Sequence, residues 1–285
     1  MATRTRKTTR KSSAASSSSK ASAPAKGAPA KRGGAANGAD PADRGRIRLF
    51  QLHEGEPALG DLDDAYEPMQ IHADDDARLE VTSFRRLHAE PSLGEVELWG
   101  ALPADMQART GLTGADLRQM ISDNPGHDLY FCNPHPEVEG LYHNLWLQGE
   151  TSHPNFLVLT REFLTAAGLD ESLTEAMYPS RLFASGQIFI ASPAFWDGYL
   201  GFIEHVLQEV DKNLSKTARA LLHSNQADAR GIHHGSTYLR FILERLFSVY
   251  LMSESADWSA YKFPIPAAEQ RLNVHLRLLR EMKDV

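Results

Sequence analysis

Residues 95–132 read EVELWGALPADMQARTGLTGADLRQMISDNPGHDLYFC, and this stretch decides the fold. Glu95–Trp99 is short and rich in β-formers, which predicts a strand. Thr113 can cap a helix over the residues that follow, where apolar positions recur at helical spacing. The apolar run Asp128–Cys132 predicts a second, buried strand. A strand, a helix and a strand in this order are typical of a parallel sheet, so the expected fold class is α/β.

The sequence predicts further strands and helices before and after residues 95–132. Gly168 supplies the stop for a helix that begins near Pro154. Ser192 and Pro193 form a cap and a first turn for a long helix. The other expected elements are strands at Ile47–Leu52 and Gly186–Ala191 and helices at Ser236–Met252 and Pro266–Met282, the last with one apolar stripe formed by Leu272, Leu276, Leu279 and Met282.

The charge of the chain is divided unevenly. The 285 residues carry a formal net charge of −7. Residues 1–46 hold 11 Lys/Arg against 2 Asp/Glu, and Ala2–Arg46 contains no Val, Leu, Ile, Phe, Tyr or Trp. Such a segment has almost nothing to bury against the entropy of ordering, which predicts a disordered basic tail. Residues 47–285, with 19 Lys/Arg against 35 Asp/Glu, are expected to form a single α/β domain.

The sequence also bears on the compartment. The single Cys132 rules out an internal disulfide and fits a reducing compartment. The tail lacks the apolar core of a secretory signal, and charges interrupt every apolar stretch before about 20 residues accumulate. These observations predict a cytoplasmic protein without a transmembrane segment, and they leave open a peripheral attachment to the inner membrane.

The polar and aromatic stretch Cys132–Glu150, CNPHPEVEGLYHNLWLQGE, follows the second strand directly. The common phosphate-loop, dinucleotide, serine-hydrolase and zinc-protease signatures are missing, so this loop is the first candidate site. In open α/β sheets, ligands bind outside the carboxyl ends of the strands. Asn133 and Asn144 could hydrogen-bond a sugar or base, Trp146 could stack on it, and Glu150 could act as a base. The alternative is a structural loop whose aromatic residues cover the core.

The helix predicted from Ser236 is apolar apart from a narrow polar stripe. On that stripe, Arg240 and Glu244 either form an ordinary surface pair or line a cleft in which Glu244 is a base. Arg245 lies beside the stripe among apolar residues, where an unpaired charge is costly. We therefore expect Arg245 to have an anionic partner, either a structural carboxylate or a ligand.

Two sets of residues suggest metals. Asp74–Asp76 could hold Mg²⁺ or Mn²⁺ through hard oxygen ligands, but with Asp61, Asp63 and Asp64 nearby we favour an acidic solvated loop. Cys132, His135, His143 and His153 include zinc-ligand types, but their spacing matches no established zinc pattern. No metal ligand is assigned from the sequence.

Five segments resemble a set of bacterial proteins regarded as glycosyltransferases of capsule or exopolysaccharide type. They are LWGALPADMQARTGLTG, YFCNP, LYHNLWLQGE with the following HPNFLVLTREFLTAAGL, SGQIFIASPAFWDGYLGFIEHVL and FILERLFSVYL, all within residues 95–252. The resemblance implies a nucleotide-sugar transferase of the GT-A kind, with a Rossmann-like mixed sheet flanked by helices. In such enzymes a D-x-D triplet often ends a strand, but Asp74–Asp76 does not align with that position, so dependence on Mn²⁺ or Mg²⁺ stays open.

The resemblance also implies site residues. Glu150 or Glu244 would be the catalytic base, and Arg245 would contact a phosphate of the donor. The residues it assigns to substrate binding are Asn133, Asn144, Trp146, Gln148, Gly149, Ser185, Gly186, Gln187 and Arg245.

The sequence is compatible with two functions. The first is a glycosyltransferase that moves a sugar from a nucleotide-sugar donor to a glycan or lipid-linked acceptor. The alternative is a non-enzymatic binding protein whose basic tail contacts nucleic acid or another polyanion through a sequence-blind, salt-dependent attraction. The tail could equally attract anionic lipid headgroups.

Overall fold

The computed structural model describes residues 46–55, 63–71, 79–224, 236–254 and 257–285. The chain divides into two units, Met1–Gly38 and Ala39–Val285, and every element described below belongs to the second. The predicted tail lies outside the described residues except for Arg46. The guanidinium of Arg46 pairs with the carboxylate of Glu97 (Nη2–Oε1 2.6 Å), so this residue is already part of the fold.

A six-stranded mixed sheet forms the centre of this unit. The strand order is β2-β1-β3-β5-β4-β6. β1 is parallel to β2 and β3, and β4 is parallel to β6, whereas β5 is antiparallel to both of its neighbours. The strands are β1 (Ile47–Glu54), β2 (Glu67–Ile71), β3 (Leu98–Pro103), β4 (Leu129–Phe131), β5 (Phe189–Ala191) and β6 (Ala260–Lys262). The α/β fold class is confirmed, and β2 and β6 are strands that the sequence did not reveal.

Residues 95–132 contain a strand, a helix and a strand as predicted, but the first strand is Leu98–Pro103 rather than Glu95–Trp99, and the sheet differs in one respect. Thr113 caps the helix through a reciprocal capping box with Asp116. β3 and β4 run in the same direction, because each is antiparallel to β5. They are not neighbours, however, since β5 lies between them. The crossover therefore skips one strand position.

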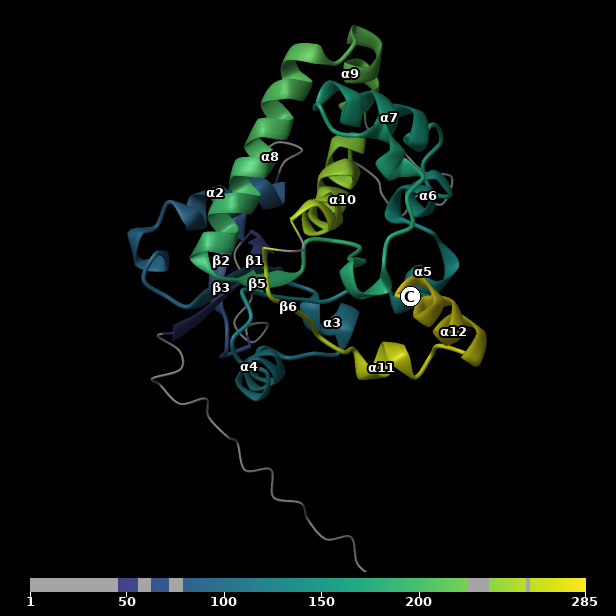
Figure 1. Ribbon diagram of the computed structural model, residues 1–285. Helices are drawn as coiled ribbons and strands as arrows, with labels where there is room; N and C mark the ends of the chain where they lie inside the picture. Colours follow the sequence, from purple (N-terminus) through teal and green to yellow (C-terminus); the bar gives the residue numbers. More distant parts are fainter. Residues whose placement is uncertain (1–45, 56–62, 72–78, 225–235, 255–256) are drawn as a thin grey trace, which may run out of the picture. The chain divides into compact units, whose positions relative to one another are not determined.

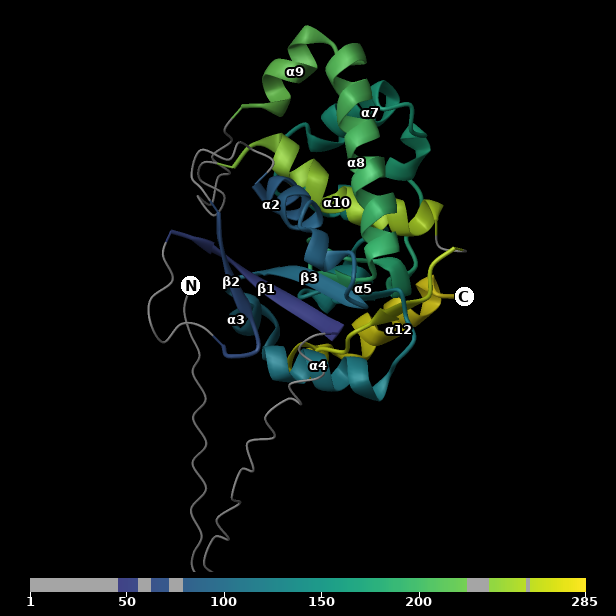
Figure 2. The same ribbon diagram turned by 90° about the vertical axis from the view of Figure 1, so that its left-hand side faces the viewer.

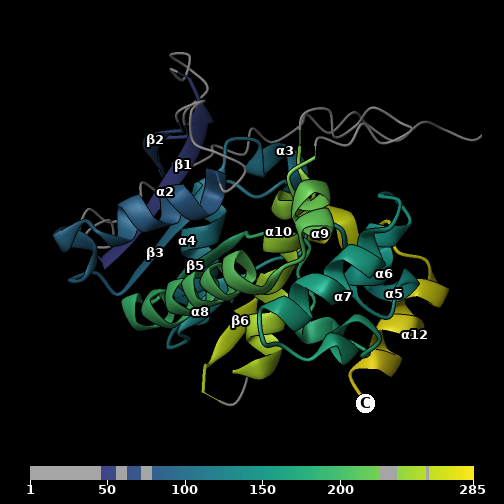
Figure 3. The ribbon, with the colours of Figure 1, turned by 90° about the horizontal axis from the view of Figure 1, so that it is seen from above.

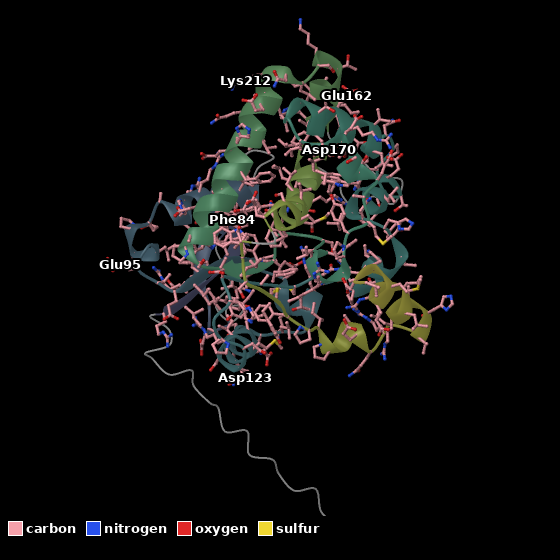
Figure 4. The ribbon with its side chains drawn as sticks, in the orientation of Figure 1. Phe84, Glu95, Asp123, Glu162, Asp170 and Lys212 are labelled. Carbon is pink, nitrogen blue, oxygen red and sulfur yellow. The ribbon has the colours of Figure 1, made fainter. Side chains whose placement is uncertain are left out.

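Helices cover both faces of the sheet. Side chains alternate along β3, so that Trp99 and Ala101 face one core cluster while Leu98 and Leu102 face the other. α2, α8 and α10 pack on the first face, and α3, α4 and α11 pack on the second (Figures 1 and 2). Phe84 of α2 is buried inside the fold, whereas Glu95, Asp123 and Lys212 lie at its edge (Figure 4).

The helices begin and end at the residues that local chemistry favours. The hydroxyl of Ser192 accepts the N–H of Phe195 at the start of α8, with Pro193 in the first turn. The helices are α2 (Leu79–His88), α3 (Met106–Thr110), α4 (Gly114–Asp123), α5 (Pro136–Leu141), α6 (Leu145–Glu150), α7 (Phe156–Ala166), α8 (Pro193–Asn213), α9 (Lys216–Leu222), α10 (Tyr238–Ser253), α11 (Pro266–Glu269) and α12 (Val274–Lys283), with short 3₁₀ turns at Pro91–Leu93, Glu171–Thr174 and Ser180–Leu182.

The predicted helix Pro266–Met282 is wrong as a single element. It is divided into α11 and α12, because Asn273 accepts the N–H of Leu276 and caps a new helix. The expected apolar stripe is divided as well. Leu272 is buried, but Met282 at the other end is 70% exposed.

Within the described residues, no helix combines the length and the apolar character that crossing a bilayer requires.

Candidate functional site

The direction of β5 brings several loops to one edge of the sheet. Phe131 at the end of β4 pairs with Phe189 at the start of β5, and Trp99 of β3 pairs with Ala191 at its end. The residues that precede β5 therefore lie beside the residues that follow β3 and β4. The carboxyl ends of parallel strands are the usual ligand-binding edge of an α/β sheet.

A pocket of about 630 Å³ lies at this edge, between the strand ends and α10. Leu52 of β1, Ile71 of β2 and Ala101 of β3 contribute apolar surface from the sheet. The charged side chains that line it come from α2, the end of β3, α3 and α10. They are Glu80, Asp105, Arg109, Arg240, Glu244 and Arg245, with His135 and His153 beside them.

Two carboxylates in the pocket share one guanidinium. Arg240 pairs with Glu80 (Nη2–Oε1 2.6 Å) and, more loosely, with Glu244 (Nε–Oε1 3.6 Å). Burial raises the pKa of the Glu244 carboxyl above its usual value, and the charge of Glu80 raises it further. Glu244 is thus a carboxylate in a pocket with a raised pKa, which is the property expected of a general base that works near neutral pH.

Arg245 is buried beside this network, with neutral partners. Its guanidinium donates to the carbonyl oxygens of Leu145 and Phe241 and to the amide oxygen of Gln148, and it lies 4.9 Å from the ring centre of Phe156. Among the described residues, no carboxylate lies within salt-bridge distance of it, so the predicted structural carboxylate is wrong. Burial lowers the pKa of Arg245 to about 10, which leaves the side chain charged at neutral pH.

A second ion pair lines the pocket at α3. Arg109 of α3 pairs with Asp105 (Nε–Oδ1 2.7 Å), and both are partly exposed. The arginine therefore keeps donors available to a ligand, since a guanidinium has five N–H groups.

The loop before β5 forms one wall of the pocket. Ser185, Gly186 and Gln187 all line it. Gly186 has φ +112°, in the region that favours glycine. The side-chain amide of Gln187 donates to Tyr199 Oη (2.8 Å) and to the carbonyl of Leu243 (3.0 Å), so its position is fixed by α8 and α10.

Asn133 fixes the position of this wall through hydrogen bonds. Its amide oxygen accepts the hydroxyl of Ser185, and its amide nitrogen donates to Glu139 (2.6 Å) and to the carbonyl of His135 (3.1 Å). Asn133 is 3% exposed and does not face the pocket itself. It positions two residues, Ser185 and His135, that do.

Three other predicted binding residues have structural contacts. Asn144 caps α6 by accepting the N–H of Leu147 (2.9 Å) and is fully buried. The indole of Trp146 is also fully buried and donates to Tyr178 Oη (2.8 Å). A side chain at Gly149 would collide with the ring of Phe156, so this glycine permits α6 and α7 to pack closely.

Glu150 lies outside the pocket lining. Its carboxylate accepts the N–H of Leu157 (2.7 Å) in the first turn of α7. An acidic side chain at a helix N-terminus satisfies an orphan donor and complements the helix dipole. The structure therefore brings together Gln148, Ser185, Gly186, Gln187, Glu244 and Arg245, and it leaves Asn133, Asn144, Trp146, Gly149 and Glu150 outside the lining.

The residues missed by sequence reasoning share one origin. Glu80 and Phe84 belong to α2, Asp105 is the residue before α3, and Arg109 lies in the last turn of α3. The sequence pattern did not separate these two helices from loops. His153 was noticed only as a zinc-ligand type. Its ring stacks on Phe241 at 4.1 Å, which adds an aromatic surface to the pocket lining.

No metal centre can be assigned in the described part of the chain, which contains no group of three or more His, Cys, Asp or Glu side chains placed to hold an ion. Cys132 is fully buried, and burial raises the pKa of its thiol to about 12, which disfavours a thiolate ligand. The triplet Asp74–Asp76 lies outside the described residues.

Comparison of the chain with family models, with curated proteins and with solved structures gave no match in any of the three. The chemistry must therefore be argued from the pocket. It offers a half-buried carboxylate with a raised pKa, a buried arginine with neutral partners and a second partly exposed arginine, at the edge of the sheet where nucleotides commonly bind.

Proposed function

We propose that this protein is a glycosyltransferase that moves a sugar from a nucleotide-sugar donor to a hydroxyl group of a glycan or lipid-linked acceptor. The observation that carries the proposal is the pocket of about 630 Å³ that contains Glu244 together with Arg109, Arg240 and Arg245. Its volume lies in the range of small-molecule sites. Its carboxylate could take the proton of an acceptor hydroxyl, and its arginines could stabilise the charge of a departing diphosphate.

In the proposed reaction, Glu244 is the general base. The acceptor oxygen forms a bond to the anomeric carbon of the sugar as its proton passes to the carboxylate of Glu244. The bond between the anomeric carbon and the phosphate oxygen breaks, and the nucleoside diphosphate leaves with the electron pair. A base with a pKa above that of a free glutamate removes a hydroxyl proton more effectively, which the raised pKa of Glu244 supports.

The arginines would stabilise the charge that develops on the diphosphate. Arg245 is fixed by three hydrogen bonds and retains two unused N–H donors. Because no carboxylate of the described residues lies within salt-bridge distance of its guanidinium, a phosphate group would supply a direct counter-charge. Arg109 and the backbone around Gly186 border the same space.

The form of the sheet is consistent with a transferase of the GT-A kind. A mixed Rossmann-like sheet with its ligand at the carboxyl ends of the parallel strands is what the family resemblance implies, and the order β2-β1-β3-β5-β4-β6 agrees with a mixed sheet of that sort. Since a fold can carry many functions, this agreement supports the proposal only together with the pocket.

The test is donor binding and turnover with the full chain. A panel of nucleotide sugars is screened by calorimetry and by release of nucleoside diphosphate, with and without Mn²⁺ or Mg²⁺. We expect one donor to bind. Arg245→Lys should then weaken binding by about tenfold, because a lysine cannot keep the same fork of donors. Arg161→Lys on α7, outside the pocket, is the matched control.

Measurements of turnover distinguish the role of Glu244 from that of Arg245. Glu244→Gln should retain donor binding and lose about 10²- to 10⁴-fold in the rate of transfer or donor hydrolysis, the usual contribution of a general base. If no nucleotide sugar binds under any of these conditions, the proposal is wrong.

We also propose a second activity, carried by the tail. Residues 1–46 contain 11 Lys/Arg and 2 Asp/Glu, which favours contact with nucleic acid or another polyanion. Binding of DNA should fall steeply as salt is raised and should be lost when residues 1–38, the first of the two units, are removed. Equal binding by the full and shortened chains would contradict it.

A further inference from the structure

The C-terminal helix α12 contacts the protein through two long polar side chains. Arg280 pairs with Glu139 (Nε–Oε2 2.9 Å), and the ammonium of Lys283 donates to the carbonyls of Glu139 and Tyr142. Three of its apolar side chains face outward. Val274, Leu278 and Met282 are 73%, 50% and 70% exposed.

These three residues form one continuous stripe. They are spaced four residues apart, and residues at this spacing are neighbours on a helix surface. α12 lies at the outer edge of the unit beside α5, whose Leu141 is also exposed (Figures 1 and 3). Exposed apolar residues that adjoin one another indicate an interaction surface rather than ordinary scatter.

The charges around the stripe are arranged along the helix. His275 and Arg277 lie in its first half and Arg271 just before it, whereas Glu281 lies in its last turn and Asp284 just after it. All five side chains are exposed. One end of this surface is therefore basic and the other acidic.

Such a surface is complementary to itself when two copies run in opposite directions. A two-fold axis through Leu278 would place Val274 against Met282 of the second copy and Leu278 against its equivalent. It would also bring the basic half of each helix, with Arg277, alongside the acidic half of the other, with Glu281. The helix dipoles would be antiparallel, and an isologous contact of this kind closes as a dimer.

From this arrangement we propose that α12 is the interface of a homodimer in which two copies of the helix pack antiparallel about a two-fold axis near Leu278. An anionic membrane fits the surface less well, because Glu281 and Asp284 adjoin the apolar stripe and residues 47–285 carry 35 Asp/Glu against 19 Lys/Arg. A ten-residue helix with Leu141 offers less area than the roughly 800 Å² per partner of standard interfaces, so the dimer should dissociate on dilution.

The test is sedimentation velocity of the full chain over about 1 to 100 μM, together with circular dichroism to confirm folding. We expect a concentration-dependent dimer. Leu278→Glu places two carboxylates against each other at the axis and should weaken dimerisation at least tenfold. Val158→Glu, at a residue of α7 that is 58% exposed, introduces the same charge elsewhere and should have no effect.

A pair of charge reversals tests the antiparallel arrangement. Arg277→Glu and Glu281→Arg should each weaken the homodimer, because each juxtaposes like charges. An equimolar mixture of the two variants should regain the dimer, since both contacts in the mixed pair become attractive. The proposal fails if the wild-type chain is monomeric throughout, if Leu278→Glu dimerises as the wild type does, or if the mixture does not regain the dimer. Binding to vesicles of anionic lipid that Leu278→Glu abolishes, without a dimer, would assign the surface to a membrane instead.

Discussion

The hydroxyl of Ser185 donates to the side-chain oxygen of Asn133, and this contact joins the loop after β4 to the loop before β5. Both loops border the pocket, at Ser185 itself and at His135. The amide of Asn133 also donates to the fully buried Glu139. The pocket wall is therefore connected to the charge cluster of Glu139, Lys262 and Arg280, which joins β6 and α12 to α5.

Asn133→Ala should therefore loosen the wall and the cluster together. It removes one hydrogen bond from Ser185 and one from the buried Glu139, and the loss of a buried polar partner costs about 1 to 3 kcal/mol. We expect the free energy of unfolding in urea to fall by about that amount. Gln119→Ala, which breaks an exposed side-chain contact with Asp123, should change it little. A loss for Asn133→Ala no larger than that of this control would contradict the role of Asn133 in the wall.

Glu150→Ala separates a structural from a catalytic glutamate. Since the carboxylate of Glu150 accepts the N–H of Leu157, its loss should lower the free energy of unfolding by about 1 kcal/mol, as the loss of a helix cap does. Transfer activity at a temperature well below the unfolding transition should persist. Glu244→Gln is the comparison, with activity lost and stability largely kept. If Glu150→Ala loses activity while its free energy of unfolding is unchanged, Glu150 is the catalytic base that the sequence suggested.

The pH dependence of the proposed reaction should respond to Glu80. Glu244 must be ionised to act as a base, so activity should rise with pH through its raised pKa. Removing the charge of Glu80 lowers that pKa, and Glu80→Gln should therefore move the acid limb of the kcat/KM profile to lower pH. Glu204→Gln on α8, which also loses an arginine partner but lies outside the pocket, should leave the profile in place. If the acid limb of Glu80→Gln stays at the wild-type pH, the charge of Glu80 does not influence the pKa of the base.

Lys283 should make stability depend on pH in the alkaline range. Burial lowers the pKa of Lys283 from its ordinary value of 10.5 to about 8, and the pKa of the neighbouring Lys262 is also lowered. Between these values Lys283 binds more protons in the unfolded chain than in the folded one, so its contribution makes the free energy of unfolding rise with pH. Urea unfolding at about pH 7.5 and pH 9.5 should show this rise, and Lys283→Met should reduce it. Lys212→Met, at an exposed lysine of α8, should preserve it, and a rise that survives in Lys283→Met would disprove the assignment.

The sequence predicted elements where local chemistry is strong. Thr113 and Ser192 cap their helices as expected, because the cap requires only neighbouring residues. The sequence did not predict β2 and β6, because both are short edge strands without a continuous apolar run. The division at Asn273 was missed because an apolar stripe was assumed to face the core, whereas α12 is held through its polar side.

The site was harder to predict because it depends on contacts distant in sequence. Glu244 and Arg245 were identified from a charge in an apolar helix, and both line the pocket. The partner of Arg240 could not be found in this way, since Glu80 lies on another helix and its approach follows from the packing of α2 and α10 on the sheet. Polar residues such as Asn144 were assigned to a ligand although they satisfy backbone groups of the protein.

The place of β5 has a consequence for how the molecule is made on the ribosome. β3 and β4 emerge well before β5, yet neither can complete its hydrogen bonds until Phe189–Ala191 is inserted between them. Until then the nascent chain presents unpaired strand edges on β3 and β4, which are prone to mispairing with other chains. Closure of the sheet should thus be a late event, and holdase chaperones that shield such edges should have their greatest effect on yield before residue 191 has left the exit tunnel.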